Sequence, residues 1–235
     1  MPLPSHTGQS PLFWRYHLVL PLVCFTVLAI AFEWGGIDRL IADAIFQLEG
    51  GRWALRSHFI TSTIIHKTGK HLSLLIALTV LIGFALSFLK PRFRDWRRPA
   101  IYLLVAAGGG SGLISLLKSV THISCPWDFS PYGGERDYVS VFHELFTRTG
   151  EDCFPAGHAS GGYAWLALYF VGLHLNSRKR WLGLAIPLGV GIVFGISQQL
   201  RGAHFISHDL WTLGICWFFS LACYLLILNR QPLAK

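Results

Sequence analysis

The chain has 235 residues, of which 52% are hydrophobic and only 14% are charged. A soluble domain carries about 25% charged residues, and here the mean hydropathy is +0.46. This composition excludes a disordered chain and disfavours a soluble globular enzyme. Twenty Lys and Arg against twelve Asp and Glu give a formal net charge of +8. The cations cluster between apolar runs, which indicates orientation in a lipid bilayer and no nucleic-acid partner.

Six apolar runs predict an all-α fold, a bundle of six transmembrane helices forming one integral membrane domain over residues 1–235. Each run has about 17–19 residues, near the short end of what crosses about 30 Å of hydrocarbon. Backbone in lipid has to satisfy its own hydrogen bonds, so the runs are expected to be helices. In chain order the predicted spans are 16–32, 72–89, 100–117, 159–175, 181–197 and 210–228.

The charges of the connecting loops predict the orientation. Short, strongly basic loops stay in the cytoplasm, and the loops 90–98 and 178–180 are of this kind. The loop 118–158 carries three cations and six anions and is expected to face outward. Both termini are then cytoplasmic, and the protein is expected in the plasma (inner) membrane with its polar site on the extracytoplasmic side.

One loop fits this orientation poorly. Alternation places residues 35–71 outside, although the segment is basic. Its first part is amphipathic and is expected to lie flat on the membrane surface. Its cations are Arg39, Arg52, Arg56, Lys67 and Lys70.

Three polar segments lie at the outward ends of predicted helices. Lys118 and Cys125-Pro126 follow the third span, and Pro155-Ala156-Gly157-His158 precedes the fourth. The stretch 198–209 joins the fifth and sixth spans. A bundle brings these ends to one depth, near the lipid headgroups.

The residue types in these segments point to phosphoryl transfer with a covalent intermediate. Lys118 and Arg201 are suited to stabilising phosphate oxygens. One neutral histidine can attack phosphorus while a second protonates the leaving group, and a carboxylate can hold the attacking imidazole in the right tautomer. Gly157 lets the backbone approach an anion, and the helix start near His158 offers N–H groups.

The three segments resemble the motifs of the type 2 phosphatidic acid phosphatase superfamily, which also includes vanadium haloperoxidases. The family pattern is Lys, six residues, Arg-Pro; then Pro-Ser-Gly-His; then Ser-Arg, five residues, His, three residues, Asp. Here Lys118 is followed after six residues by Cys125-Pro126, the second motif reads Pro155-Ala156-Gly157-His158, and Ser197-Gln198 precedes His204 by five residues. Cys, Ala and Gln thus replace Arg, Ser and Arg, as in a divergent branch.

The resemblance implies a membrane phosphatase or phosphotransferase acting on lipid-linked phosphate or diphosphate at the outer leaflet, with no metal or other cofactor. It implies His204 as the nucleophile that becomes phospho-histidine, and His158 as the general acid and then the base for water. The residues expected to bind phosphate are Lys118, Arg201, Gly157 and Ser160, and the expected supporting residues are His208, Gln198 and Pro126.

The third motif leaves one alternative open. The family's Asp falls on His208, and Asp209 is one residue beyond. In an unbroken helix His204 and Asp209 diverge by about 140°. Asp209 is therefore the catalytic residue that orients His204 only if residues 205–207 are not regular helix; otherwise His208 takes that role. Arg201 shares a face with Gln198 if the stretch is helical, and then supplies the missing guanidinium.

Two of the five cysteines, Cys125 and Cys153, lie in the outward loop beside the first and second motifs. An oxidising outer compartment permits disulfides. We expect a Cys125–Cys153 disulfide that ties the segment of Lys118 to that of His158.

Two other classes of function stay open from the sequence. A metal-dependent hydrolase would use His122, His158, His204, His208 and Asp209, although their spacing fits no zinc pattern. A catalytically inactive lipid-binding or transport protein would keep the same helices. Sparse charge within the spans and no evident inverted repeat speak against transport.

Overall fold

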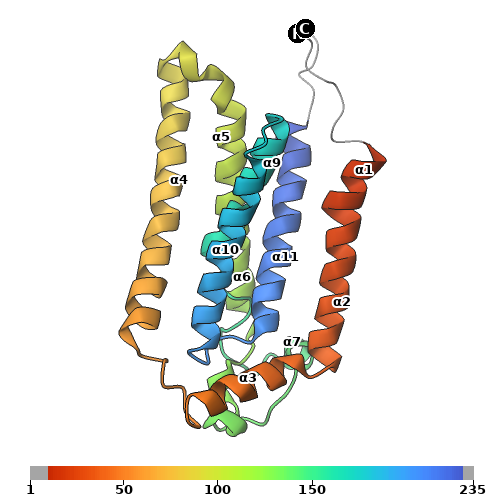
Figure 1. Cartoon of the computed structure of the whole chain (residues 1–235), viewed down its shortest axis with the longest axis vertical. Helices are drawn as coiled ribbons and strands as arrows, with labels where there is room; N and C mark the ends of the chain where they lie inside the picture. The colour runs from red at the N-terminus through yellow and green to blue at the C-terminus, as the bar shows by residue number, and fades with distance from the viewer. Residues whose placement is uncertain (1–9, 230–235) are drawn as a thin grey trace.

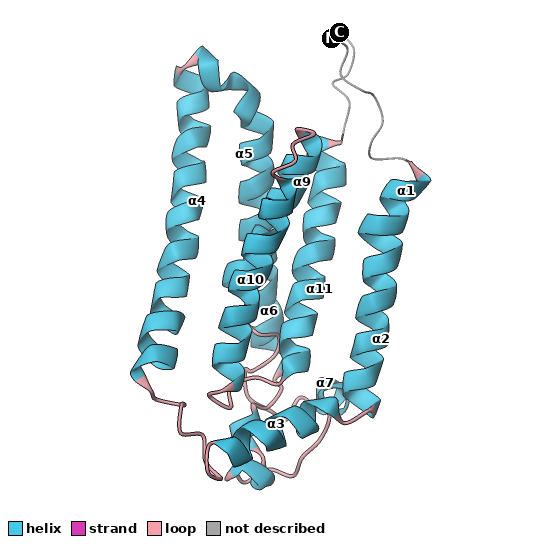
Figure 2. Ribbon diagram, viewed as in Figure 1, coloured by secondary structure: helices cyan, strands magenta, loops and turns pink. Residues whose placement is uncertain are grey.

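The protein is seen here as a computed structural model that describes residues 10–229, except the side chains of residues 66–70. It is a bundle of roughly parallel helices, closed at one end by loops and shorter helices (Figure 1). The described residues contain no strand, only isolated bridges such as Ile123 with Asp152 (Figure 2). The predicted all-α class is confirmed.

The elements are, in chain order, α1 (Pro11–Trp14), η1 (Arg15–Val19), α2 (Leu20–Trp34), α3 (Ile37–Leu48), η2 (Ile60–Ile65), α4 (His66–Leu89), η3 (Pro91–Trp96), α5 (Arg97–Leu103), η4 (Leu104–Gly108), α6 (Gly109–Thr121), η5 (Pro126–Asp128), η6 (Ser130–Tyr132), α7 (Val141–Thr147), α8 (Ser160–Tyr163), η7 (Ala164–Leu166), α9 (Ala167–His174), α10 (Arg180–Gln199), α11 (Ile206–Cys223) and η8 (Tyr224–Leu228).

Five helical stretches among the described residues are long and apolar enough to cross a membrane. Consecutive elements join end to end to form three of them, which is why these three are longer than the elements that compose them. The stretches are Pro11–Trp34, His71–Leu89, Pro91–Thr121, Arg180–Gln199 and Ile206–Leu228. Each contains one predicted span, so five of the six predicted runs form helices of membrane length.

The predicted fourth span, 159–175, is helical over most of its residues but is shorter than the other five stretches. It consists of three consecutive pieces, α8, η7 and α9, of four, three and eight residues, so the count of six membrane-length helices is not confirmed. Its core-facing side chains, such as Leu166 and Phe170, are fully buried. Irregular backbone is tolerated at membrane depth where protein surrounds it, and a methyl group on Gly162 would overlap the backbone of Gly191 in α10. Neighbouring helices therefore shelter this short segment.

The spans differ in how much of their surface the protein covers. Only 6% of the apolar window of Pro11–Trp34 and of His71–Leu89 is buried, against 39% in Pro91–Thr121 and in Ile206–Leu228. The first two stretches stand at the periphery of the bundle (Figure 1). Their uncovered side chains are apolar, which is the surface that a bilayer requires.

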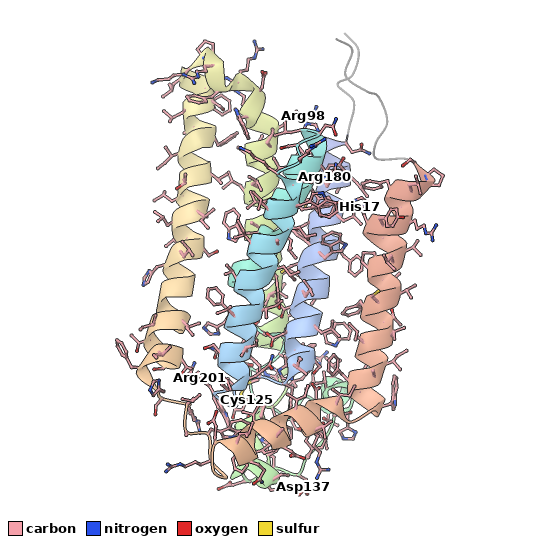
Figure 3. All side chains as sticks on the ribbon, in the orientation of Figure 1. His17, Arg98, Cys125, Asp137, Arg180 and Arg201 are labelled. Carbon is pink, nitrogen blue, oxygen red and sulfur yellow. A yellow bond between two sulfur atoms is a disulfide. The ribbon has the colours of Figure 1, made fainter. Side chains whose placement is uncertain are left out.

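The two ends of the bundle differ in charge. Arg98 and Arg180 mark one end, whereas Cys125, Arg201 and Asp137 mark the other (Figure 3). The basic loops 90–98 and 178–180 therefore lie opposite the acidic loop 118–158. Residues 1–9 and 230–235, on which the predicted position of the termini depends, lie outside the described residues, as do the side chains of Lys67 and Lys70.

Helix α3 lies across the second end and covers the loops there (Figure 1). Its residue Ala42 is buried in a cluster with Phe129, Tyr132 and Phe205, and the Tyr132 hydroxyl donates to Asp43 Oδ1 at 2.8 Å. Part of the apolar face that was expected to rest on a membrane surface thus packs on the protein, whereas Leu40 and Leu48 of the same helix stay exposed. α3 is a cover over the polar segments.

Asp38 on α3 is a buried carboxylate that accepts the Ser207 N–H in the first turn of α11 at 2.9 Å. Burial raises the pKa of Asp38 from 3.8 to about 6, and the hydrogen bonds from Ser207 offset this only in part. The folded protein therefore binds this proton more tightly than the unfolded chain does. The free energy of unfolding falls as pH rises from about 4 to about 6, and this contribution is constant above that window.

Replacing Asp38 with asparagine keeps an oxygen acceptor for Ser207 and removes the ionisation. We expect the stability of Asp38→Asn relative to the unsubstituted protein to rise by about 2 kcal/mol between about pH 4 and about pH 7. Thermal unfolding in detergent across this range measures it. Asp95→Asn, at an exposed carboxylate of the opposite end, is the control, and a difference that does not change with pH would contradict the prediction.

Candidate active site

The chain that follows α6 and the chain that precedes α8 run side by side. Cys153 N–H donates to the Ile123 carbonyl at 3.0 Å, and the Thr121 hydroxyl donates to the Phe154 carbonyl at 2.6 Å. The first and second polar segments are therefore joined by main-chain contacts.

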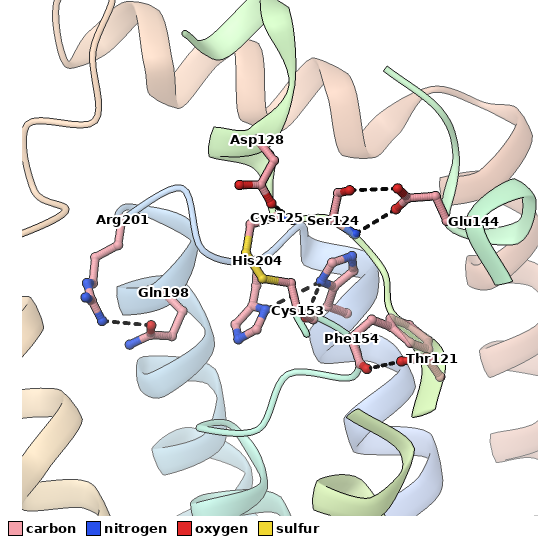
Figure 4. The surroundings of a disulfide bond; sticks show 11 residues. Thr121, Ser124, Cys125, Asp128, Glu144, Cys153, Phe154, Gln198, Arg201 and His204 are labelled. Atoms are coloured by element: carbon pink, nitrogen blue, oxygen red, sulfur yellow. Dashed lines mark hydrogen bonds between the residues drawn. A yellow bond between two sulfur atoms is a disulfide. The ribbon is translucent and has the colours of Figure 1, made fainter. Parts of the chain in front are cut away.

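A disulfide and hydrogen bonds to two carboxylates hold the same junction. Cys125 and Cys153 form a disulfide with their Cα atoms 5.3 Å apart (Figure 4). The carboxylate of Glu144, on α7 and only 2% exposed, accepts from both the N–H and the hydroxyl of Ser124 at 2.7 Å. Asp128 Oδ2 accepts the Cys125 N–H at 2.7 Å. The turn of the first motif is thus held by the disulfide and by hydrogen bonds to Glu144 and Asp128.

The third segment joins the other two through the backbone. Trp127 N–H donates to the Gly202 carbonyl at 3.1 Å, and Ala156 N–H donates to the His208 carbonyl at 3.3 Å. Segments more than 50 positions apart in the chain thus meet at one end of the bundle, as the helix-end argument predicts.

A cleft of about 510 Å³ lies where the segments meet. It brings together four of the residues expected to carry the chemistry, Lys118, His158, Arg201 and His204, and a further cation, Arg56, also lines it. Carboxylates occupy part of its rim. The charged and imidazole residues that line it are Lys118, His158, Arg201, His204, Arg56, Asp128, Glu151 and Asp152.

His204 is 4% exposed and precedes α11, which begins at Ile206. Its Nδ1 lies 3.5 Å from Nδ1 of His208, which donates to the Cys153 carbonyl at 2.9 Å (Figure 4). The Cys153 main chain also lies close enough to His204 to influence its pKa. Burial lowers the pKa of His204 well below its ordinary value, and neighbouring cationic groups lower it further. The imidazole is therefore neutral, with a lone pair, at physiological pH.

Asp209 points toward α10. Gln199 Nε2 donates to its Oδ2 at 2.6 Å, and a Cβ on Gly195 would lie 2.7 Å from its Cγ. Of the two residues considered as the partner of His204, the structure brings His208 to it and places Asp209 in the contact between α10 and α11.

Arg201 lies just beyond the end of α10 and turns back along it. Its Nη1 donates to Gln198 Oε1 at 3.0 Å, so the two side chains share a face, as the spacing predicts. Gln198 is 3% exposed and lines the cleft. The glutamine at the family's arginine position thus holds the guanidinium that comes from three residues later (Figure 4).

The remaining expected residues are Lys118, Gly157, Ser160 and Pro126. The Lys118 ammonium lies 4.0 Å from where a Gly157 Cβ would be, so Gly157 leaves room for the lysine over the backbone. The Ser160 hydroxyl donates to the Gly157 carbonyl at 2.7 Å and lines a neighbouring groove, not the cleft. Pro126 is fully buried and shapes the turn without lining the cleft.

The geometry does not favour the metal-dependent alternative. Within residues 10–229, potential ligand atoms of three or more side chains come within 4.8 Å of one another at Cys125, Asp128 and Cys153, and both sulfurs there are used in the disulfide. The five residues proposed as ligands from sequence do not form such a group. His122 instead pairs with Asp152 at 3.1 Å.

Two contributors were not found by sequence motifs. Glu144, on α7, accepts two hydrogen bonds from Ser124 in the first motif. No local sequence pattern marks this glutamate. Arg56 comes from the loop after α3, and the only signal was that this loop is more basic than an outward loop should be.

Comparison with known proteins agrees with the motifs. The family model of the PAP2 superfamily matches residues 99–232, more than half of the chain and all three polar segments. No curated protein and no solved structure matches the chain significantly. With the matching region covering α5 to η8 and every residue of the motif set, the chain belongs to the PAP2 superfamily, the type 2 phosphatidic acid phosphatases and their relatives.

Proposed function

We propose that this protein removes or transfers the phosphate of a membrane lipid monophosphate or diphosphate at the outer leaflet, through a phospho-histidine on His204. Membership in the superfamily suggests phosphatase activity, and the apolar helices suggest a membrane protein. One observation carries the finer proposal: Lys118, His158, Arg201 and His204 line a single cleft, and that cleft is continuous with an apolar groove.

In the first step the neutral His204 imidazole attacks phosphorus and the bond from phosphorus to the lipid oxygen breaks. His158 gives its proton to the departing oxygen. Lys118 and Arg201 stabilise the non-bridging oxygens, more strongly in a partly dry cleft than in water. The His208 ring, itself held by the Cys153 carbonyl, holds the His204 ring in place, so that one ring nitrogen faces the phosphate.

In the second step His158, now neutral, takes a proton from water as the water attacks the phospho-histidine. The phosphorus–nitrogen bond breaks, and inorganic phosphate leaves with His204 restored. A lipid hydroxyl in place of water gives transfer to a second lipid by the same path. Positive charge in the cleft stabilises the dianionic product as well as the substrate.

The groove beside the cleft supports a lipid substrate. It has a volume of about 440 Å³ and shares His158 and Gln198 with the cleft. Most of its lining is apolar and comes from the spans, with Leu74 of α4, Leu104 of η4 and Phe194 of α10 as examples. A phosphate in the cleft thus leaves its hydrocarbon chain a path along the groove toward the bilayer.

Loop charge supports the outer leaflet. The cleft lies at the end of the bundle opposite the basic loops 90–98 and 178–180 (Figure 3). Short loops rich in Lys and Arg stay in the cytoplasm, so the cleft faces away from it. The Cys125–Cys153 disulfide suits the same side, because oxidising compartments lie outside the cytoplasm.

A screen for phosphate release tests the proposal. Purified protein in detergent is given phosphatidic acid, phosphatidylglycerol phosphate, polyprenyl diphosphate and lipid A phosphate, with His204→Ala and His158→Ala in parallel. We expect release from at least one lipid that both substitutions reduce and that vanadate inhibits without added metal. No release from any lipid would favour a lipid-binding protein, and chelator-sensitive release restored by metal would favour a metal-dependent hydrolase.

A further inference from the structure

The loop 49–59 between α3 and η2 supplies the cleft with a cation that lies outside every motif. Arg56 lines the cleft together with Lys118 and Arg201. Its guanidinium carbon lies 4.1 Å from the ring centroid of Trp127, in the turn of the first motif. We propose that Arg56 is a third cationic ligand of the substrate phosphoryl group, a role that rests on the function proposed above.

The position of Arg56 is built into the fold. Its carbonyl accepts Arg201 Nε at 2.8 Å, and the ring of Trp53 covers Gly202, whose φ of 69° and lack of a Cβ permit the contact. The Leu55 carbonyl accepts the Thr61 hydroxyl at 2.6 Å. Loop 49–59 is therefore attached to the third segment, and stacking on Trp127 orients the exposed side chain.

This arrangement replaces a guanidinium that the first motif lacks. The family pattern has Arg where this chain has Cys125, and that cysteine is used in the disulfide. Trp127, two residues later, carries the Arg56 guanidinium instead. An arginine presents a planar pair of donors that fits two phosphate oxygens at once, which a lysine cannot do.

Arg201 alone does not replace the guanidinium that the first motif lacks. Two of its donors are already used, Nε on the Arg56 carbonyl and Nη1 on Gln198. Its pKa is lowered, first by burial and then by the charge of Arg56, so the two guanidinium groups repel across the cleft. An anion bound between them relieves this repulsion.

Three carboxylates, those of Asp128, Glu151 and Asp152, also lie at the rim of the cleft. Asp128 accepts the Cys125 N–H, and Asp152 pairs with His122.

The inference also accounts for the basic outward loop. A loop that supplies a phosphate ligand has a reason to carry positive charge whatever the orientation rule prefers. Arg56 serves this purpose, whereas Arg52 in the same loop is exposed and does not line the cleft. Arg52 is therefore a matched control.

The test compares Arg56→Ala, Arg56→Lys and Arg52→Ala in full-length protein. We expect Arg56→Ala to raise both the KM for dioctanoyl phosphatidic acid and the inhibition constant of vanadate by about tenfold or more, the effect of losing a charged hydrogen bond. Arg56→Lys recovers part of both, because it keeps the charge and loses the planar donors. Arg52→Ala changes neither. The carbonyl bound by Arg201 is main chain and survives each substitution, and a thermal unfolding scan verifies the fold.

The outcomes separate this inference from the proposed function. Vanadate reports the phosphoryl group alone, and the lipid reports headgroup and chains together, so equal shifts in both support the assignment. A shift confined to the lipid, or Arg56→Ala behaving like Arg52→Ala in an active protein, overturns the role of Arg56 and leaves the phosphatase intact. Protein that neither releases phosphate from any lipid nor binds vanadate overturns the proposed function and this inference with it.

Discussion

Replacing His204 with alanine is expected to reduce lipid phosphate release by on the order of 10⁴-fold or more, the scale seen when a covalent nucleophile is removed. No neighbouring group replaces it in the cleft, because His208 is fully buried and donates to the Cys153 carbonyl. The loss is expected in kcat more than in KM, since Lys118 and Arg201 still bind the phosphate. Steady-state kinetics with the lipid found active in the screen measure it.

Trapping the intermediate makes this prediction specific to a nucleophile. Rapid quenching with radiolabelled substrate is expected to leave an acid-labile, alkali-stable label on the unsubstituted protein and none on His204→Ala. His158→Ala should lose most activity on lipid phosphate but much less on p-nitrophenyl phosphate, whose leaving group needs no proton. His143→Ala, at an exposed position on α7, is the control. A His204→Ala protein that still takes up label would show that another residue is the nucleophile.

Loss of the Cys125–Cys153 disulfide has the second largest expected effect. The cysteines are 28 positions apart, and loop-closure entropy then predicts a loss of about 3.5 kcal/mol in the free energy of unfolding. Activity is expected to fall as well, because the Cys153 carbonyl accepts from His208, whose ring contacts that of His204. Cys125→Ser, Cys153→Ser and the double variant should therefore be similar to one another in thermal stability and in phosphate release.

Cys24→Ser is the matched control, because Cys24 is an exposed free cysteine of α2. Reductant should lower the Tm of the unsubstituted protein and leave that of the double variant unchanged. Mass spectrometry that finds free thiols at positions 125 and 153 in fully active, stable protein would contradict the prediction.

The helical spans and the segments that form the site were predictable because the information is local. Hydropathy is a property of each residue, and lipid forces an apolar run to satisfy its own backbone, so five spans follow from composition alone. The segment α8–α9 covers nearly the predicted residues but is shorter than the five membrane-length helices, and protein surrounds it, so the rule for a lipid-exposed helix does not apply to it. Motif spacing likewise placed Lys118, His158 and His204 in one cleft.

The contacts within the site depend on tertiary structure. Whether His208 or Asp209 meets His204 is decided by where α11 begins and by the hydrogen bond from Gln199 that holds Asp209 against α10, which a spacing rule cannot predict. The Cys153 carbonyl is a main-chain atom that every residue possesses, so no sequence pattern marks it. Arg56 reaches the cleft only because Trp53 and Arg201 hold a distant loop against the third segment. Local chemistry thus set the helices and the reacting groups, and long-range packing selected the partners that orient and charge them.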